Sequence, residues 1–148
     1  LMKASSFFYR ISVVEDAVLA FGTGGVTAMH DPTEGGTAGG IHEIADASNV
    51  GVEVFEAKMP THKETMEICE FFKIDPLQLI SSGALLIAAK QNVANKIVEK
   101  LGKNRIEAAI IGEFLQEPEK RVLVRKNGRK ETLVRPLSDH LWKALKQE

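Results

Sequence analysis

Cysteine is almost missing from this sequence, which has one residue of this type, Cys69, in 148. A single thiol excludes an internal disulfide framework and favours a reducing compartment. Long apolar runs are missing too, since no stretch approaches the ~18 residues that a membrane-spanning helix requires. Residues 1–10 contain no continuous apolar segment and therefore do not resemble a signal peptide. We expect a cytoplasmic protein that does not cross a membrane.

An excess of charge of either sign is also absent. The 19 Lys and Arg residues face 20 Asp and Glu residues, which leaves a formal net charge of −1. Such a chain has no overall field that would draw it to nucleic acid or to a membrane surface. The one local basic cluster, Lys120–Lys130, surrounds a predicted hairpin and favours a solvated surface over a phosphate-backbone site. We expect no nucleic-acid partner.

No internal repeat, low-complexity linker or long loop divides the chain, and its length fits one domain with a core of ordinary size. Apolar spacing predicts helices near residues 14–21, 33–48, 61–72, 93–101 and 141–145. Predicted strands cover residues 26–29, 52–55, 84–89 and 107–114, and Asn127-Gly128 marks a hairpin between residues 121–125 and 131–135. This order predicts an α+β fold, a mixed β-sheet packed with helices, in a single domain of residues 1–148.

Several local signals refine these elements. The apolar run at residues 84–89 predicts a strand buried on both faces, and residues 107–114 predict another. Thr61 with Glu64 is the pattern of a capping box. Gly102 is placed to end its helix in a left-handed conformation. Trp142 is expected to anchor the last helix to the rest of the protein.

The segment that carries the most chemical information is Val26–Gly40, in which a predicted strand runs through a glycine-rich turn into a helix. Free N–H groups at a helix N-terminus and the helix dipole favour an anion, and glycines allow a ligand to approach the backbone. The segment is not a Walker loop, since no Gly-Lys-Ser/Thr follows, and it lacks the dinucleotide-binding glycine pattern. One hypothesis is therefore an anion site of another kind.

The alternative is a helix start with no ligand. Asp31 has the residue type of an N-cap, Pro32 suits the first helical position, and Glu34 has a capping-box position. Gly39 and Gly40 would then allow the helix to pack closely on the sheet. The two interpretations are compatible, because a cap satisfies only one or two of the four free N–H groups.

The histidines do not have the spacing of a metal site, and none is predicted. His30, in a loop at a helix start, is expected to orient its neighbours by hydrogen bonding. His42 is expected at the surface or in helix packing, and His62 and His140 are expected to be solvated. Cys69 is interpreted as a small hydrophobic residue.

Two consecutive segments resemble a known family. Met29–Gly36 (Met-His-Asp-Pro-Thr-Glu-Gly-Gly) and Ile41–Ser48 (Ile-His-Glu-Ile-Ala-Asp-Ala-Ser) resemble the C-terminal domain of HypE-type hydrogenase maturation proteins. These proteins belong to the AIR synthase (PurM) superfamily. The similarity continues through residues 50–52, 75–77 and 82–86, and so covers most of residues 11–112. The Asp-Pro-Thr-x-Gly-Gly form is specific to the HypE-like branch, whereas the purine enzyme resembles Thr-Gly-Gly-Gly there.

The resemblance implies a PurM C-terminal-domain-like fold in a two-domain protein that dimerises through its N-terminal domains. Those domains bind ATP and Mg²⁺, and the C-terminal domain closes the substrate and phosphate cleft with its glycine-rich loop. The binding residues that the resemblance implies here are His30, Asp31, Thr33, Glu34, Gly35, Gly36, Ser82 and Gly83; no catalytic residue is assigned. The N-terminal domain is expected to be absent from this chain, which would then be inactive alone. Expected partners are that domain, a second copy and maturation proteins.

Three features differ from the HypE pattern. HypE proteins form a cyanide precursor on a C-terminal cysteine, whereas residues 145–148 are Leu-Lys-Gln-Glu, without the thiolate nucleophile. Glu34 stands where these proteins usually carry Arg, a bidentate phosphate ligand. Residues 81–83 are Ser-Ser-Gly where many have Asn-Glu-Gly. These differences favour a paralogue with another substrate, and the second hypothesis is a non-catalytic paralogue or binding module.

Overall fold

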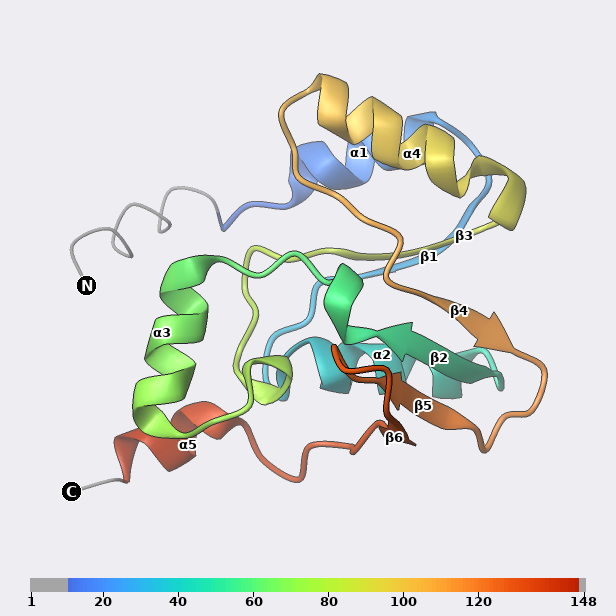
Figure 1. Ribbon diagram of the computed structural model, residues 1–148. Coiled ribbons are helices and arrows are strands. Elements are labelled where there is room, and N and C mark those ends of the chain that lie inside the picture. The colour runs from blue at the N-terminus through green and yellow to red at the C-terminus, as the bar shows by residue number, and fades with distance from the viewer. Residues whose placement is uncertain (1–10, 147–148) are drawn as a thin grey trace.

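The structure is a computed structural model and describes residues 11–146. Its fold is α+β, as predicted (Figure 1). The α-helices are α1 Val14–Gly22, α2 Gly36–Ala47, α3 Lys63–Phe72, α4 Gln91–Lys103 and α5 His140–Leu145. The strands are β1 Val26–His30, β2 Gly51–Phe55, β3 Leu86–Ala89, β4 Gly112–Leu115, β5 Arg121–Val124 and β6 Lys130–Thr132. Two short 3₁₀ turns are η2 Glu56–Lys58 and η3 Pro76–Gln78. Within the described range, no helix is long and apolar enough to span a bilayer.

The strands form two sheets rather than one. The larger sheet has the order β4-β2-β5-β6, in which β2 and β5 are parallel and both outer pairs are antiparallel. The smaller sheet pairs β1 with β3 in an antiparallel arrangement. The larger sheet is therefore mixed, as expected, and the predicted hairpin around Gly128 forms between β5 and β6.

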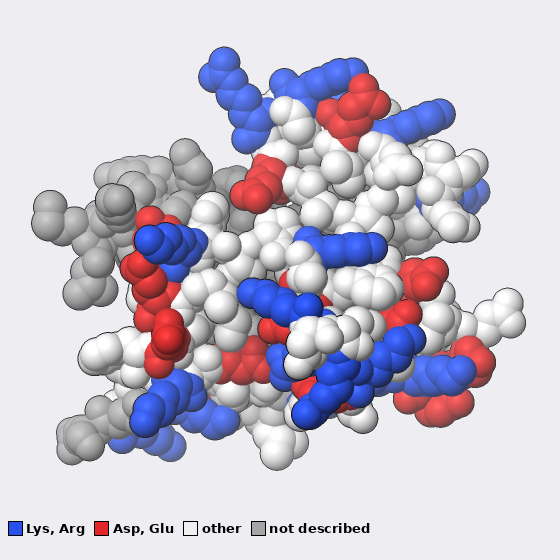
Figure 2. Space-filling view, in the orientation of Figure 1, with Lys and Arg blue, Asp and Glu red and all other residues white. Residues whose placement is uncertain are grey.

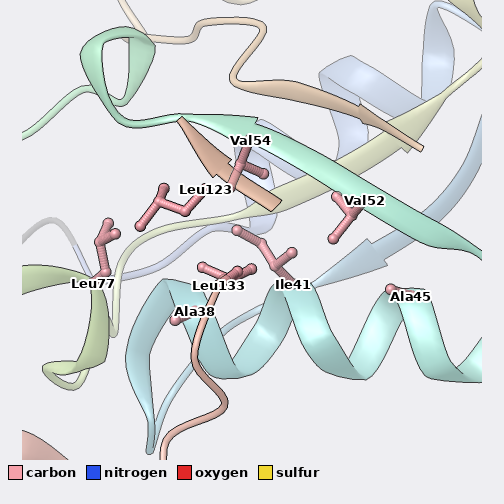
Figure 3. Close-up of a cluster of buried hydrophobic side chains, with 8 residues drawn as sticks. All are labelled: Ala38, Ile41, Ala45, Val52, Val54, Leu77, Leu123 and Leu133. Carbon is pink, nitrogen blue, oxygen red and sulfur yellow. The ribbon is translucent and has the colours of Figure 1, made fainter. Parts of the chain in front are cut away.

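The main core lies between α2 and the larger sheet (Figure 3). Ala38, Ile41 and Ala45 lie on one face of α2, as their helical spacing predicts, and are buried. The opposing side chains are Val52, Val54, Leu77, Leu123 and Leu133. Full burial of such aliphatic side chains contributes about 1.5–3 kcal/mol each. Ser48, predicted on the same face, is exposed because α2 ends at Ala47.

A second cluster holds α1 against α4, at the top of Figure 1 beside β1 and β3. Ala20 of α1 and Ile97 and Leu101 of α4 are its buried residues. The amphipathic pattern of α4 is thus confirmed. Its predicted terminator is not, because Gly102 lies inside the helix and the left-handed residue is Arg105, with φ 63°.

Three predictions about strands and caps are wrong. The run at 84–89 forms a strand only over Leu86–Ala89, where only Ala88 is buried, because its sheet has two strands. The strand predicted at 107–114 begins at Gly112 and pairs only with β2, at the edge of its sheet. The N-cap of α3 is His62, which makes no side-chain capping bond, and the Thr61 hydroxyl donates to the Met59 carbonyl (3.4 Å) instead.

The basic cluster at residues 120–130 is paired with acidic side chains. Arg125 contacts Glu131 (2.6 Å) and Glu56 (3.4 Å), and Lys130 contacts Glu53 (2.6 Å). Figure 2 shows Lys and Arg interleaved with Asp and Glu over this part of the surface. The pairing agrees with a solvated surface, since the positive charges are largely balanced locally.

Candidate functional site

The glycine-rich loop, residues 31–36, ends in two consecutive left-handed residues, Gly35 (φ 78°) and Gly36 (φ 62°). Left-handed residues interrupt a right-handed helix, so α2 cannot extend back through this turn to residue 33 and begins at the second of the two glycines, Gly36. A Cβ on Gly36 would lie 2.3 Å from the Leu79 carbonyl oxygen and 2.8 Å from that of Leu77. Glycine is therefore required here both by backbone conformation and by the close approach of residues 77–79.

The predicted capping role of Asp31 is wrong. The cap of α2 is Gly35, no side chain caps the helix, and Asp31 is exposed. The reason is the loop itself, because Pro32 is buried and the turn through Gly35 separates Asp31 from the first helical N–H groups. Glu34 is exposed and likewise makes no capping bond.

Two N–H groups of the loop are already bonded. The Gly36 N–H donates to the Thr33 carbonyl (3.0 Å), and the Gly35 N–H donates to Asp139 Oδ2 (2.8 Å). The N–H groups of Thr37 and Ala38 find no acceptor among the described residues. Ala38 is buried in the main core, whereas Thr37 is partly exposed, so the Thr37 N–H is the donor of α2 that a ligand could still use.

The turn at residues 81–83 lies against the start of α2. The Thr37 hydroxyl oxygen is 3.5 Å from that of Ser81, which also donates to the Leu79 carbonyl (2.9 Å). Ser82, the predicted site residue, is exposed, and Gly83 has the left-handed φ of 94°. The contact between the two segments thus uses Thr37 and Ser81, which were not predicted as site residues, although Ser81 directly precedes the predicted pair.

His30 lies along α2 rather than at its N-terminus. Its Nε2 is 2.6 Å from Glu43 Oε2, and its Cδ2 would lie 2.8 Å from a Cβ on Gly40. His30 therefore makes the polar contact that was predicted for it, with Glu43 of α2. Gly40 allows the close packing of α2 that was expected of it. Residues 11–146 include no group of three or more His, Cys, Asp or Glu side chains that could hold a metal.

Two other residues pack as the sequence predicts. His42 is buried on α2, and its Nε2 is 2.9 Å from the Leu133 carbonyl oxygen, which agrees with the helix-packing alternative. Burial lowers the pKa of His42 below its ordinary value, so the neutral ring donates this bond. Cys69 is buried in α3, and burial raises the pKa of its thiol, as suits a packing residue.

The C-terminal segment contains two buried polar residues that the sequence did not reveal. His140, predicted to be solvated, is buried and accepts the Asp75 N–H at Nδ1 (2.9 Å). Asp139 is buried and accepts the N–H groups of Gly35 and Leu141. These two residues anchor α5, whereas Trp142, the predicted anchor, is 49% exposed. No local pattern could show contacts across 104 and 65 positions of sequence.

The fold agrees with what comparisons with known proteins find. The chain belongs to the family of AIR synthase related proteins, C-terminal domain, whose model matches residues 9–125. Among curated relatives, a hydrogenase expression/formation protein of Methanocaldococcus jannaschii is 38% identical over 97 residues, which cover 62% of this chain and 28% of that protein. The carbamoyl dehydratase HypE of Escherichia coli is 34% identical over 94 residues, with the same coverage of 62% and 28%.

Solved structures lead to the same group. A crystal structure of E. coli HypE matches with a TM-score of 0.78 and 29% identity, covering 89% of this chain and 41% of that one. A HypE-HypF complex matches with a TM-score of 0.77 and 27% identity, covering 84% and 41%. A HypE structure in complex with ATP matches with a TM-score of 0.70 and 25% identity, covering 80% of this chain and 38% of that one. The matches therefore cover less than half of the length of each of these relatives.

The geometry leads to a first prediction, on Asp31. We expect Asp31→Ala to change the free energy of unfolding by less than about 0.5 kcal/mol, because the side chain is exposed and does not cap α2. Denaturant midpoints of the parent and the variant would be compared, with Glu34→Ala, at the other exposed acidic residue of the loop, as the control. A loss near 1 kcal/mol, typical of a removed cap, would show that Asp31 caps the helix after all.

Proposed function

We propose that this chain is the C-terminal domain of a HypE-like, ATP-dependent protein. In this proposal residues 1–148 are one domain, and the glycine-rich loop closes a substrate and phosphate cleft over an N-terminal ATP-binding domain. The supporting observation is a contact at the start of α2 between Thr37, which follows the loop, and Ser81, which precedes Ser82 and Gly83. This contact brings two segments of the family resemblance next to each other. The class of reaction is activation of a carbonyl or amide oxygen by phosphoryl transfer.

The residues at this point fit one phosphate group of ATP, but not the whole nucleotide. The Thr37 N–H would donate to a phosphate oxygen, with the hydroxyls of Thr37 and Ser81 beside it. Asp31 and Glu34 are exposed carboxylates of the same loop and weaken anion binding. When bound, ATP would supply the phosphoryl group; Mg²⁺ would be held by carboxylates of the N-terminal domain.

The family comparisons suggest partners for the whole protein. A HypE-HypF complex stands among the similar structures, so we propose a maturation protein as a partner, together with a second copy bound through the N-terminal domains. A cytoplasmic location follows from the same proposal. The alternative is a non-catalytic paralogue or binding module, which the exposed Glu34 and Ser82 favour, because both differ from the HypE pattern.

The proposal assigns nucleotide binding to another domain, which leads to a second prediction. We expect the 148-residue chain to release no phosphate from MgATP above the background of a heat-unfolded sample. The measurement is phosphate release after repeated purification, with Asp31→Ala as the loop variant, because this exposed residue should not affect folding. Turnover that co-purifies with the chain and is lost in the variant would mean that this domain hydrolyses ATP by itself.

The third prediction concerns Glu34 and tests the loop as a phosphate site. Replacing Glu34 by Arg removes a like charge and supplies a bidentate donor, so the affinity for inorganic phosphate should rise about tenfold, or about 1.4 kcal/mol. Amide chemical shifts of residues 33–38 would be followed during a phosphate titration at low and high salt. The gain should shrink with salt, because the side chain is exposed.

Glu15→Arg is the matched control for this titration. Glu15 is an exposed glutamate in the first turn of another helix, α1, and its replacement makes the same change of net charge. A gain confined to Glu34→Arg supports the phosphate site. An equal gain in both variants would mean that phosphate responds only to net charge. Amides that shift in neither variant would favour the binding-module alternative.

A further inference from the structure

The C-terminal segment makes two buried polar contacts at consecutive positions. Asp139 and His140 are 4% and 8% exposed, and each accepts a backbone N–H from a distant part of the chain. Asp139 reaches Gly35 of the glycine-rich loop, and His140 reaches Asp75 at the start of η3. Both residues lie beyond residue 125, where the match to the family ends.

The two segments held in this way also contact each other. Gly36 packs against the carbonyl oxygens of Leu77 and Leu79, with no room for a Cβ between them. Pro136 lies over Gly35, 3.5 Å from the position of its missing Cβ. The loop, the η3 segment and residues 136–141 therefore form one three-way junction, in which the C-terminal segment touches both of the others.

Asp139 couples the loop to α5 because one carboxylate serves both. Its Oδ2 accepts the Gly35 N–H (2.8 Å), while its Oδ1 accepts the Leu141 N–H (2.7 Å) and caps α5. A displacement of Gly35 must therefore either break a buried hydrogen bond or move the start of α5. Leaving a buried N–H without its acceptor is unfavourable, so the two elements should move together.

His140 makes the junction sensitive to protons. Its Nδ1 must lack a proton to accept the Asp75 N–H, so the neutral ring carries its single proton on Nε2. Nε2 lies 2.7 Å from Nζ of Lys143 and, being protonated, does not accept from it. The charged groups around it are Lys143 of α5, Asp75 before η3 and the adjacent Asp139. Burial and Lys143 lower the pKa of His140, and the two carboxylates oppose this. A second ring proton would abolish the bond to Asp75 and place an imidazolium beside an ammonium group.

We propose that residues 136–141 are a latch that holds the glycine-rich loop in its present shape, and that protonation of His140 releases it. Asp139 and His140 are then positioning residues that act on the loop through backbone bonds. The latch is fully closed above pH about 6.5, the ordinary pKa of histidine, and opens as pH falls through the lower pKa of the folded state. The inference goes beyond the proposed function, since it requires no ligand.

The experiment follows the loop and α5 separately in the 148-residue chain between pH 8 and pH 5. Amide shifts of Gly35 and Gly36 report the loop, and the emission of Trp142, the one tryptophan, reports α5. We expect both signals to change together with one midpoint below pH 6.5, and Trp142 emission to shift to the red as α5 leaves. His140→Asn keeps an acceptor near Nδ1 but cannot titrate, so both transitions should disappear.

Two further variants keep the test decisive. In Asp139→Asn one carboxylate oxygen becomes an NH₂ donor, so the loop and α5 signals should separate into different midpoints. His42→Asn removes the other buried histidine with a lowered pKa and should leave the junction transition in place. The latch is refuted if Gly35 and Trp142 do not respond together in the parent, or if the transition persists in His140→Asn. Because no phosphate is added, failure here would not bear on the phosphate site.

Discussion

Replacing Gly36 by alanine should destabilise the protein by about 3 kcal/mol, through a left-handed backbone conformation and a steric clash. Gly36 has φ 62°, which costs an L-residue about 1–2 kcal/mol by itself. The new methyl group would also be built 2.3 Å from the Leu79 carbonyl oxygen, which is main chain and cannot rotate away as a side chain would. The free energy of unfolding from urea denaturation is the measurement.

Gly102→Ala is the matched control for Gly36→Ala. Gly102 lies inside α4 with nothing within 4 Å of its missing Cβ, so alanine there should stabilise the protein by about 0.5–1 kcal/mol. The same substitution should thus have opposite signs at the two positions. If Gly36→Ala has the same denaturation midpoint as the parent, then the carbonyl groups of Leu77 and Leu79 do not approach Gly36 as closely as described.

Replacing Leu133 by alanine should cost about 2–5 kcal/mol, the range for a buried leucine that leaves a cavity. Leu133 is 2% exposed and packs among Ala38, Ile41 and Leu123 in the main core. The residue follows β6, beyond the end of the family match at residue 125. A loss of this size would show that the main core includes the C-terminal segment.

Leu137→Ala is the control from the same segment. Leu137 is fully exposed, at 102%, and its replacement should change the free energy of unfolding by less than about 0.5 kcal/mol. Thermal or denaturant unfolding of both variants would be compared with the parent. Equal losses at the two leucines would contradict the packing described here, since they differ only in burial.

Much of the fold followed from local pattern in the sequence. The apolar spacing of α1, α2 and α4 and the Asn127-Gly128 turn predicted elements that the structure contains, because periodicity and turn chemistry act within a few residues. The motif Asp-Pro-Thr-x-Gly-Gly indicated the family, which the comparisons confirm. Caps were less predictable, because Asp31 and Thr61 have the right residue type and yet do not cap.

The sequence by itself determined the α+β class, the family and the position of the glycine-rich loop. Tertiary structure alone decided what that loop contacts. Gly36 is confined by carbonyl groups of residues 77 and 79, and the Gly35 N–H is occupied by Asp139, 104 positions away. Two buried polar residues, Asp139 and His140, looked like ordinary surface residues in the sequence. The physical reason is that a hydrogen bond between distant segments depends on how the chain packs, and no spacing along the sequence records it.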